Sequence, residues 1–350
     1  MGLLYQLSKD NLVAVNTAVG QTDRVNIQEF TAQGGTWGPI LCSNTIDSVG
    51  KVSEQLKQFY LYKNIARIIP LAMIDDLISV RCCGFDSIET NITINSIIEL
   101  KKLEFHVPNG KKKSKCHFLH VGKKSNSCPG IGMKVHGVKT DRVPEAMYFG
   151  DIIREDGKNT TNIKNRTKKG LGIVSKIMNI LGTITFGSKY FEIASTLRQA
   201  ELVNGILTNA EVWYGLSKSQ IEELEEVDKL LIRKILNAPM SACIESLYLE
   251  LGLTPIHIII KSRRVKYLHY LVRLNKSEML YRVFQAQWNY PVKDDWTTTV
   301  KQDLMDLKIN LSLEEIKEKT DGIFKRLVKI KTKEYTLEYL LNLKQKHSKI

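Results

Sequence analysis

The spacing of hydrophobic residues changes about halfway along the chain. Residues 1–155 alternate short β-type apolar runs with Gly-rich turns, for example a strand over 11–17 followed by a turn at 19–21. Residues 91–103 are the exception, because their apolar positions recur at helical spacing and predict an amphipathic helix. From about residue 160 onward the strand pattern disappears. The sequence therefore predicts an α+β fold, with the strands first and a long helical part after them.

The helical part divides into eight predicted segments. Ser219-Gln220-Ile221-Glu222 has the pattern of a capping box at the start of the third segment, and Pro239 ends that segment. A polar break at 291–295 separates the last two helices from the others. The predicted helices cover residues 162–182, 188–213, 219–237, 244–252, 255–274, 276–288, 296–308 and 312–345.

Two adjacent carboxylates, Asp75 and Asp76, interrupt an apolar part of the strand-rich region. The runs on either side, 68–74 and 77–83, are of the short buried-strand type, so we expect a hairpin with the acidic pair at its tip. Holding two neighbouring anions together is costly, and no strand or turn requires it. Carboxylate oxygens are the ligands that hard divalent cations prefer, so the pair is a candidate metal site.

Composition and charge indicate a folded protein with a polyanionic partner. The 350 residues are 43% apolar and 25% charged, which is typical of globular domains and excludes a disordered chain. The 51 Lys and Arg residues exceed the 37 Asp and Glu residues, giving a net charge of +14. Nucleic acid is the simplest partner for such a surplus, although a merely soluble basic protein is the alternative interpretation.

The cysteines and the apolar runs bear on localisation. The six cysteines show no disulfide-framework spacing, and Cys82 and Cys83 are adjacent. We find no signal-peptide pattern at Met1 and no run of 18 or more apolar residues. The sequence thus predicts a reduced, intracellular protein, nuclear or cytoplasmic, without a transmembrane segment.

Three further features lie around the acidic pair in a definite order. Gln33-Gly34-Gly35 precedes a helical stretch, where backbone N–H groups favour an anion and glycine allows close approach. Residues 101–124 contain eight lysines against one acid, a density suited to phosphates. Residues 146–153 form an apolar β-type segment that contains a glycine.

Taken in order, these features resemble a known series of motifs. The chain is similar to the consecutive palm motifs B, C, D and E of reverse transcriptases, closest to those of non-LTR (LINE-type) retrotransposons. Residues 204–214, 247–252 and 262–264 are similar to the thumb and post-thumb regions of these enzymes, so the resemblance covers nearly the whole chain. It implies a partial reverse transcriptase palm at 1–155, a helical thumb at 156–240 and a C-terminal helical region at 241–350. The matching residues are Gln33-Gly34, Trp37-Gly38-Pro39, Asp75-Asp76, Lys115-Cys116 and Tyr148-Phe149-Gly150-Asp151.

The resemblance also implies an activity and its catalytic residues. The activity is RNA-directed DNA polymerisation by two-metal nucleotidyl transfer, in which carboxylates hold Mg²⁺ or Mn²⁺ at the reacting groups. Asp75 would coordinate the metals and Asp76 would support the same site. Lys115 would lie near the incoming triphosphate and could donate a proton to the leaving pyrophosphate.

The remaining implied roles concern binding. Gln33 and Gly34 would line the nucleotide and template pocket, and Tyr148, Phe149 and Gly150 would form the primer grip. The implied partners are an RNA template and a DNA primer, with a deoxynucleoside triphosphate as the substrate. The helices after residue 160 would follow the duplex backbone through their basic faces.

Two departures from the family pattern qualify the expected activity. Met73-Ile74 stands where the family has Phe or Tyr followed by Ala. The family's other essential aspartate, in motif A, has no counterpart, because only Asp10 and Asp23 occur in the 32 residues before Gln33. We therefore expect an incomplete two-metal site and a chain that is inactive alone. The alternatives are a catalytically dead nucleic-acid-binding remnant and a folded helical protein without retained activity.

The sequence does not favour two other chemistries, a structural zinc site and a nuclease core. Cys116, His117, His120 and Cys128 lie close in sequence, but the paired-cysteine spacing of structural zinc sites is missing. The Pro and Asp residues of 291–296 superficially resemble a nuclease core, but they lack the acidic-x-Lys strand that should follow. An inter-helix linker is the favoured interpretation of that segment.

Overall fold

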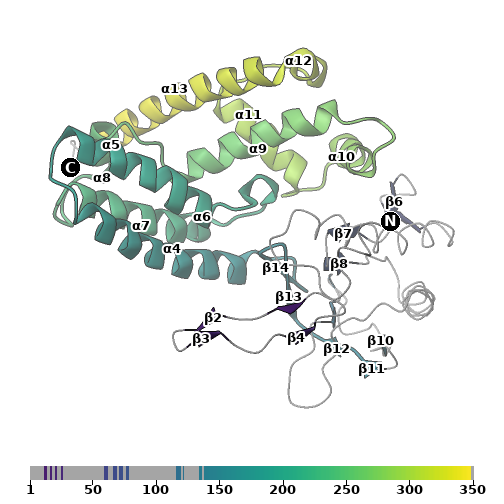
Figure 1. The fold of residues 1–350 in the computed structure, drawn as a ribbon. Coiled ribbons are helices and arrows are strands. Elements are labelled where there is room, and N and C mark those ends of the chain that lie inside the picture. The colour runs from purple at the N-terminus through teal and green to yellow at the C-terminus, as the bar shows by residue number, and fades with distance from the viewer. Residues whose placement is uncertain are drawn as a thin grey trace. The chain divides into compact units, whose positions relative to one another are not determined.

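The computed structural model describes residues 138–347 throughout (Figure 1). Before them it describes residues 116–119, 121 and 134–135, together with the backbone of short strands between residues 12 and 78. The chain divides into two compact units, Met1–Gln58 with Ile68–Glu104, and Phe59–Arg67 with Phe105–Ile350. Among the described residues helices dominate and the strands form two-stranded pairs, which is a helix-rich α+β composition.

In the first unit, the described residues form three antiparallel strand pairs. β7 pairs with β8 so that Met73 lies opposite Asp76, which confirms the predicted hairpin; Asp75 itself lies outside the described residues. The predicted turn at 19–21 is wrong in its position, because Gly20 and Gln21 are strand residues paired with Thr17 and Asn16. The predicted helix at 91–103 lies outside the described residues. The pairs are β1 (Leu12–Val13) with β4 (Val25–Asn26), β2 (Asn16–Thr17) with β3 (Gly20–Gln21), and β7 (Leu71–Met73) with β8 (Asp76–Ile78).

Most of the other described strands belong to the second unit, and the last pair leads into the helical part. β13 (Glu145–Tyr148) and β14 (Asp151–Arg154) form an antiparallel hairpin immediately before the first long helix. The other pairs are β5 (Phe59–Leu61) with β6 (Ala66–Ile68), β10 (Lys134–Val135) with β11 (Val138–Lys139), and β9 (His117–Phe118) with β12 (Asp141–Arg142). The last of these pairs is parallel.

Most of the predicted helices are present with bounds close to those expected. They are α4 (Thr160–Leu181), α5 (Ser188–Leu197), α6 (Asn204–Ile206), α7 (Lys218–Ile235), α8 (Ile244–Glu250), α9 (Ile256–Arg273), α10 (Met279–Asn289), α11 (Trp296–Asp306), α12 (Leu313–Glu318) and α13 (Asp321–His347). A π-helical segment, Arg198–Val203, joins α5 to α6, and a 3₁₀ turn, Ala210–Val212, follows α6.

Two helices predicted as continuous are interrupted. The segment at 188–213 changes to π-helical geometry after Leu197 and stops before Asn209, whose φ of 62° is left-handed and ends a helix. The segment at 312–345 breaks at Lys319, whose backbone is extended. There the carbonyl of Lys319 lies 2.9 Å from Nε2 of the buried His269, so a side chain on α9 takes the place of an intrahelical partner.

The capping box of α7 lies two residues earlier than predicted. Ser217, not Ser219, is the N-cap residue: its hydroxyl accepts from the backbone N–H of Gln220, and the Gln220 side chain accepts from the N–H of Ser217. Gln220 can take the role that Glu222 was expected to play because its amide oxygen is an equivalent acceptor.

Two large hydrophobic cores lie within the helical part. The first joins α4, α7 and the segments between them, with Ile163, Leu202 and Leu231 fully buried. The second joins α9, α11 and α13, with Val265, Val300 and Phe324 fully buried. α9 contributes to both cores, with Ile256 and Ile260 in the first and Val265 to Val272 in the second. A single long helix therefore connects the two cores.

A buried ion pair fixes the π-helical segment against α7. Both side chains are buried, and the Arg198 guanidinium donates to both Asp228 carboxylate oxygens at 2.7 and 2.6 Å. The hydroxyl of Tyr248 donates to Asp228 at 2.8 Å, and Arg198 also donates to the carbonyl of Thr254. Burial lowers the pKa of Arg198, but the charge of Asp228 and its hydrogen bond outweigh this effect and raise the pKa.

Candidate nucleic-acid interface

The turn between β13 and β14 has an unusual backbone. Tyr148 pairs with Asp151, so the turn consists of Phe149 and Gly150 alone, with φ angles of 48° and 76°. Positive φ at both central residues is the type I′ pattern, which matches the twist of a hairpin. Glycine adopts it freely, but a left-handed backbone costs a residue with a side chain about 1–2 kcal/mol. Phe149 is therefore held in this conformation by its surroundings.

The carboxylate of Asp151 is the centre of those surroundings. It accepts from the side-chain amide of Asn162 at 2.8 Å and from the guanidinium of Arg166 at 3.0 Å, both on α4. It also accepts from the side-chain amide of Asn209 at 2.7 Å. Arg166 is 7% exposed and Asp151 is 20% exposed, so the ion pair between them is largely shielded from solvent. The carboxylate thereby connects the hairpin to α4 and to the start of the 3₁₀ turn.

The same donors also bind the carbonyl oxygens of the turn. Arg166 donates to the carbonyl of Gly150 at 2.8 Å, and Asn209 donates to the carbonyl of Phe149 at 3.0 Å. Both residues of the turn are thus fixed by side chains from elsewhere in the chain. Meanwhile Phe149 remains 40% exposed and Met147 72% exposed. The arrangement presents apolar side chains to solvent on a backbone that cannot easily rearrange.

α4 follows this hairpin directly in the chain (Figure 1). Its exposed positions include several lysines. The helix contains no acidic residue. Lys164, Lys168 and Lys169 are exposed, and none of them forms an ion pair with the described residues. Lys176 is paired with Glu201 at 2.9 Å. Exposed lysines without acidic neighbours attract phosphates and do not distinguish one base sequence from another.

The structure describes some of the site residues predicted from the sequence and leaves others outside the described range. Tyr148, Phe149 and Gly150 are brought together at the hairpin turn, with the Tyr148 and Phe149 rings 4.2 Å apart. The backbone of Asp76 begins β8, but its side chain is not described. The other predicted residues, Gln33, Gly34, Asp75 and Lys115, lie outside the described residues.

The remaining predicted chemistry can be placed only in part. Of the residues considered for zinc, Cys116 is partly buried and His117 is exposed on β9, whereas His120 and Cys128 lie outside the described residues. Where the structure is described, no three His, Cys, Asp or Glu side chains are grouped as metal ligands. Over the same residues, no helix has the length and apolar character needed to cross a membrane.

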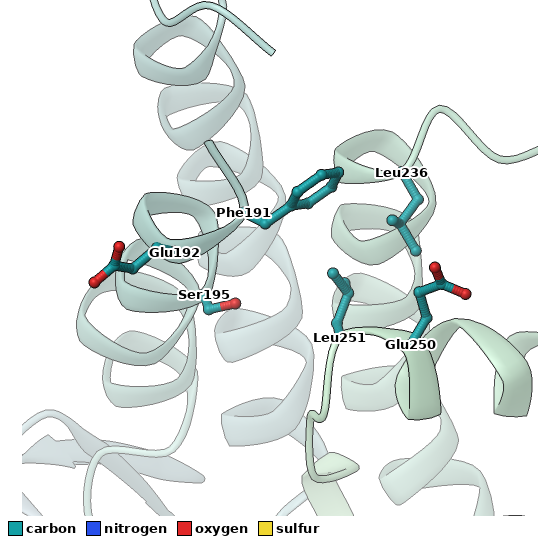
Figure 2. Close-up of a pocket in the computed structure, with 6 residues that line it drawn as sticks. All are labelled: Phe191, Glu192, Ser195, Leu236, Glu250 and Leu251. Atoms are coloured by element: carbon teal, nitrogen blue, oxygen red, sulfur yellow. The ribbon is translucent and has the colours of Figure 1, made fainter. Parts of the chain in front are cut away.

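A pocket of about 310 Å³ lies on another part of the helical bundle. Its apolar residues come from α5 and from the C-caps of α7 and α8, and Figure 2 shows Phe191, Leu236 and Leu251 facing the same space. Glu192 and Glu250 also line it, so the charge at its rim is acidic. No residue predicted from the sequence as functional lines this pocket, and its charge is unsuited to phosphate.

Sequence reasoning did not identify the residues that hold the hairpin. Asp151 and Asn209 lie inside segments that resemble the reverse transcriptase motifs, but the resemblance implies no role for either residue. They are 58 residues apart, and no sequence spacing connects them. Nothing in the sequence distinguishes Arg166 from the other basic residues of α4. Their association follows from the tertiary packing of α4 against the hairpin and the helix–turn segment.

No family profile, curated protein or solved structure matches the chain. The site is therefore interpreted from its own geometry and from the motif resemblance.

Proposed function

We propose that this chain is part of the reverse transcriptase of a non-LTR retrotransposon and that it binds a primer–template duplex. The observation that carries the proposal is the β13–β14 turn, whose two carbonyls and following carboxylate are fixed by Arg166 and Asn209. The proposal places the end of the primer strand at this turn and the duplex along the lysine-bearing face of α4.

The geometry suits that role for physical reasons. A strand end must be held within a fraction of an ångström of its productive position, which requires a rigid support. The fixed carbonyls of Phe149 and Gly150 provide the rigidity, and the exposed ring of Phe149 can contact a sugar or a base. Lys164 and Lys168, one helical turn apart, can contact phosphates of the backbone.

The catalytic part of the proposal comes from the motif resemblance. Asp75 and Asp76 would hold Mg²⁺ or Mn²⁺, which stabilises charge on the transferring phosphate when it is bound. Gln33 and Gly34 would contact the nucleotide and template. Lys115 would lie near the triphosphate.

A second candidate is a nucleic-acid-binding protein without polymerase activity. The observation that favours it is that the hairpin turn, which Arg166 and Asn209 fix, and the exposed lysines of α4 are neighbours in the chain and lie within the same unit. Binding to a duplex would need only the turn and these lysines. The two candidates thus predict the same binding and differ in chemistry.

Primer extension and duplex binding test the two candidates together. The chain is incubated with an RNA template, an annealed labelled DNA primer, deoxynucleoside triphosphates and either Mg²⁺ or Mn²⁺. Extension that is abolished by Asp75→Ala supports the polymerase and contradicts the expectation that the metal site is incomplete. Salt-dependent binding of the duplex without extension supports the binding protein.

The binding measurement needs variants that distinguish the loss of specific α4 lysines from a general reduction of the net charge. Lys164→Glu combined with Lys168→Glu should weaken duplex binding by at least tenfold at low salt, because phosphate contacts and their counterion release are lost. Lys317→Glu combined with Lys344→Glu makes the same charge change on exposed positions of α12 and α13. Equal weakening by both pairs, or no duplex binding by the unmodified chain, would contradict the proposed surface.

A further inference from the structure

The exposed side of the second half of α9 consists of basic and aromatic residues. Positions three or four apart lie on one side of a helix, and five such positions in the second half of α9 form a continuous stripe. The stripe consists of Arg263, Lys266, Tyr267, Tyr270 and Arg273, and none of these residues is buried. The opposite side of the same helix is buried, and Val265, Leu268 and Val272 pack there in the second core.

Packing holds the aromatic members of the stripe in place. The rings of Tyr267 and Tyr270 are stacked, with centroids 5.7 Å apart and planes at 22°. The ring of Tyr267 also contacts the ring of the buried Trp296 edge-on, with centroids 5.8 Å apart. This contact with the core fixes the position of Tyr267. Tyr270 is 52% exposed, so part of a preformed aromatic stack is accessible to solvent. Ordering such a platform costs little when a planar ligand binds, because the rings are already positioned.

The basic members of the stripe are extended by α13. Burial lowers the pKa of Lys266, and the positive charges of Arg263, Lys325 and Lys329 lower it further. Both α13 lysines are exposed and lie one turn apart, beside the buried Phe324 and Val328 that pack against α9. Lys266 and Lys329 form no ion pair with any described residue.

Two acids lie close to the stripe and do not neutralise it. Asp321 pairs with Lys325 at 2.7 Å, and Glu211 lies near enough to Arg263 to act on its charge. The Arg263 guanidinium also donates to the carbonyl of Leu207 at 2.5 Å and to the side chain of Asn204 at 2.7 Å. The stripe therefore keeps a net positive charge, with Arg263 fixed beside the aromatic stack.

We propose that the α9 stripe, extended by Lys325 and Lys329 of α13, binds single-stranded nucleic acid. Lysines and arginines along a surface contact the phosphate backbone, and an exposed ring stacks on a base that is not paired. An unpaired base is available in a single strand but not inside a duplex, where stacking occupies both faces. The exposed ring of Tyr270 thus favours a single strand over a duplex.

The stripe shares no residue with the hairpin and α4, although Arg263 of the stripe and Arg166 of α4 both donate to the segment 204–207. The observations that support it do not depend on the proposed polymerase function. Failure of one proposal therefore leaves the other standing. The two sites can also be tested in the same protein, because their variants lie on different helices.

The test is fluorescence anisotropy with labelled oligothymidine and oligouridine of about 20 nucleotides, longer than the site size of one binding module. Tyr270→Ala should weaken binding about tenfold, and Tyr270→Phe should restore it, because the ring supplies the stacking. Lys266→Glu combined with Lys329→Glu should weaken binding and reduce its salt dependence. The Tyr270→Ala loss should be smaller for a duplex of the same length.

Matched controls make these losses interpretable. Tyr290→Ala removes another half-exposed tyrosine, and Lys344→Glu changes a lysine further along α13. Circular dichroism and thermal unfolding of each variant confirm that it is folded. The Lys164 and Lys168 changes on α4 should leave the binding of oligothymidine within about twofold of the unmodified chain, since the α9 contacts supply most of that affinity.

Three results would overturn the proposal. The first is unchanged binding of both oligonucleotides by Tyr270→Ala. The second is equal weakening by the stripe variants and by their controls. The third is binding to phosphatidylserine vesicles that Lys266→Glu with Lys329→Glu abolishes while neither oligonucleotide binds, since this would make an anionic membrane surface the ligand.

Discussion

The side-chain amide of Asn209 donates to the carboxylate of Asp151 at 2.7 Å and to the carbonyl of Phe149 at 3.0 Å. Asn209 adopts a left-handed backbone with φ of 62°, a conformation that asparagine tolerates better than most residues. One residue thus ends the helical segment and fixes the hairpin turn. The local conformation that breaks the predicted helix at 188–213 also positions the donor that the hairpin requires.

Replacing Asn209 should separate these two roles. Asn209→Gly keeps the left-handed backbone and removes both hydrogen bonds, one of them to a charged acceptor, so we expect a loss of about 1.5 kcal/mol. Asn209→Ala removes the same bonds and adds about 1 kcal/mol of backbone strain. The free energy of unfolding in urea measures both. A smaller loss for alanine than for glycine would contradict this explanation.

Phe149 should show a trade-off between stability and binding. Asparagine is favoured at the first central position of a type I′ turn, so Phe149→Asn should stabilise the protein by about 1 kcal/mol. The same change removes the exposed ring and should weaken primer–template binding. Thermal unfolding and duplex anisotropy measure the two effects. If Phe149→Asn destabilises the protein, the ring is needed for packing and the proposed role of the exposed side chain is wrong.

The sequence predicts elements well where the pattern is local. The helices α4, α7, α8, α9 and α11 and the hairpin of β7 with β8 follow from periodicity alone. It fails where a distant side chain replaces a local bond, as at Lys319, whose carbonyl is contacted by His269 from 50 residues away. Prediction from the sequence also fails where two residues could serve equally well as the acceptor of a capping box. In α7 the acceptor is Gln220 and not Glu222.

In the candidate site too, the sequence identifies residues that are contiguous in the chain and misses those that come together only in the fold. The hairpin residues Tyr148, Phe149 and Gly150 could be found because they are contiguous in a recognisable motif. Their supports, Arg166 and Asn209, could not, since each comes from a separate helical segment. The α9 stripe is regular enough in spacing to be found from sequence. Its significance depends on knowing that the opposite face of α9 is buried.

The buried Arg198–Asp228 pair should be sensitive to the loss of one charge. Asp228→Asn leaves a buried guanidinium without its counter-charge, so we expect a loss of about 3–5 kcal/mol in the free energy of unfolding. Tyr248→Phe removes only the hydroxyl that donates to Asp228 and should cost about 1 kcal/mol. If Asp228→Asn does not fold, Tyr248→Phe still allows the contribution of the cluster to be measured. Similar losses for both would show that Tyr248, rather than the charge pair, dominates the cluster.

Glu225 should give the protein an acid-sensitive component of stability. Burial raises the pKa of this carboxyl, but the hydrogen bond from His257 and the charges of His257 and Lys229 outweigh burial and lower it. A pKa that is lower in the folded than in the unfolded protein stabilises the fold above the unfolded value, near 4.5. This contribution is lost as the pH falls through the folded pKa.

Glu225→Gln should therefore lower stability by about 1.5 kcal/mol at neutral pH, because His257 then bonds a neutral acceptor and the attraction between the carboxylate and Lys229 is lost. The difference from the unmodified chain should shrink as the pH falls below about 4.5 and through the folded pKa, where the native carboxyl becomes protonated. Glu222→Gln is the matched control on the same helix, since its side chain is 55% exposed. Urea unfolding at several pH values measures all three proteins. A difference that stays constant across this range would show that Glu225 stabilises the fold through packing rather than through its charge.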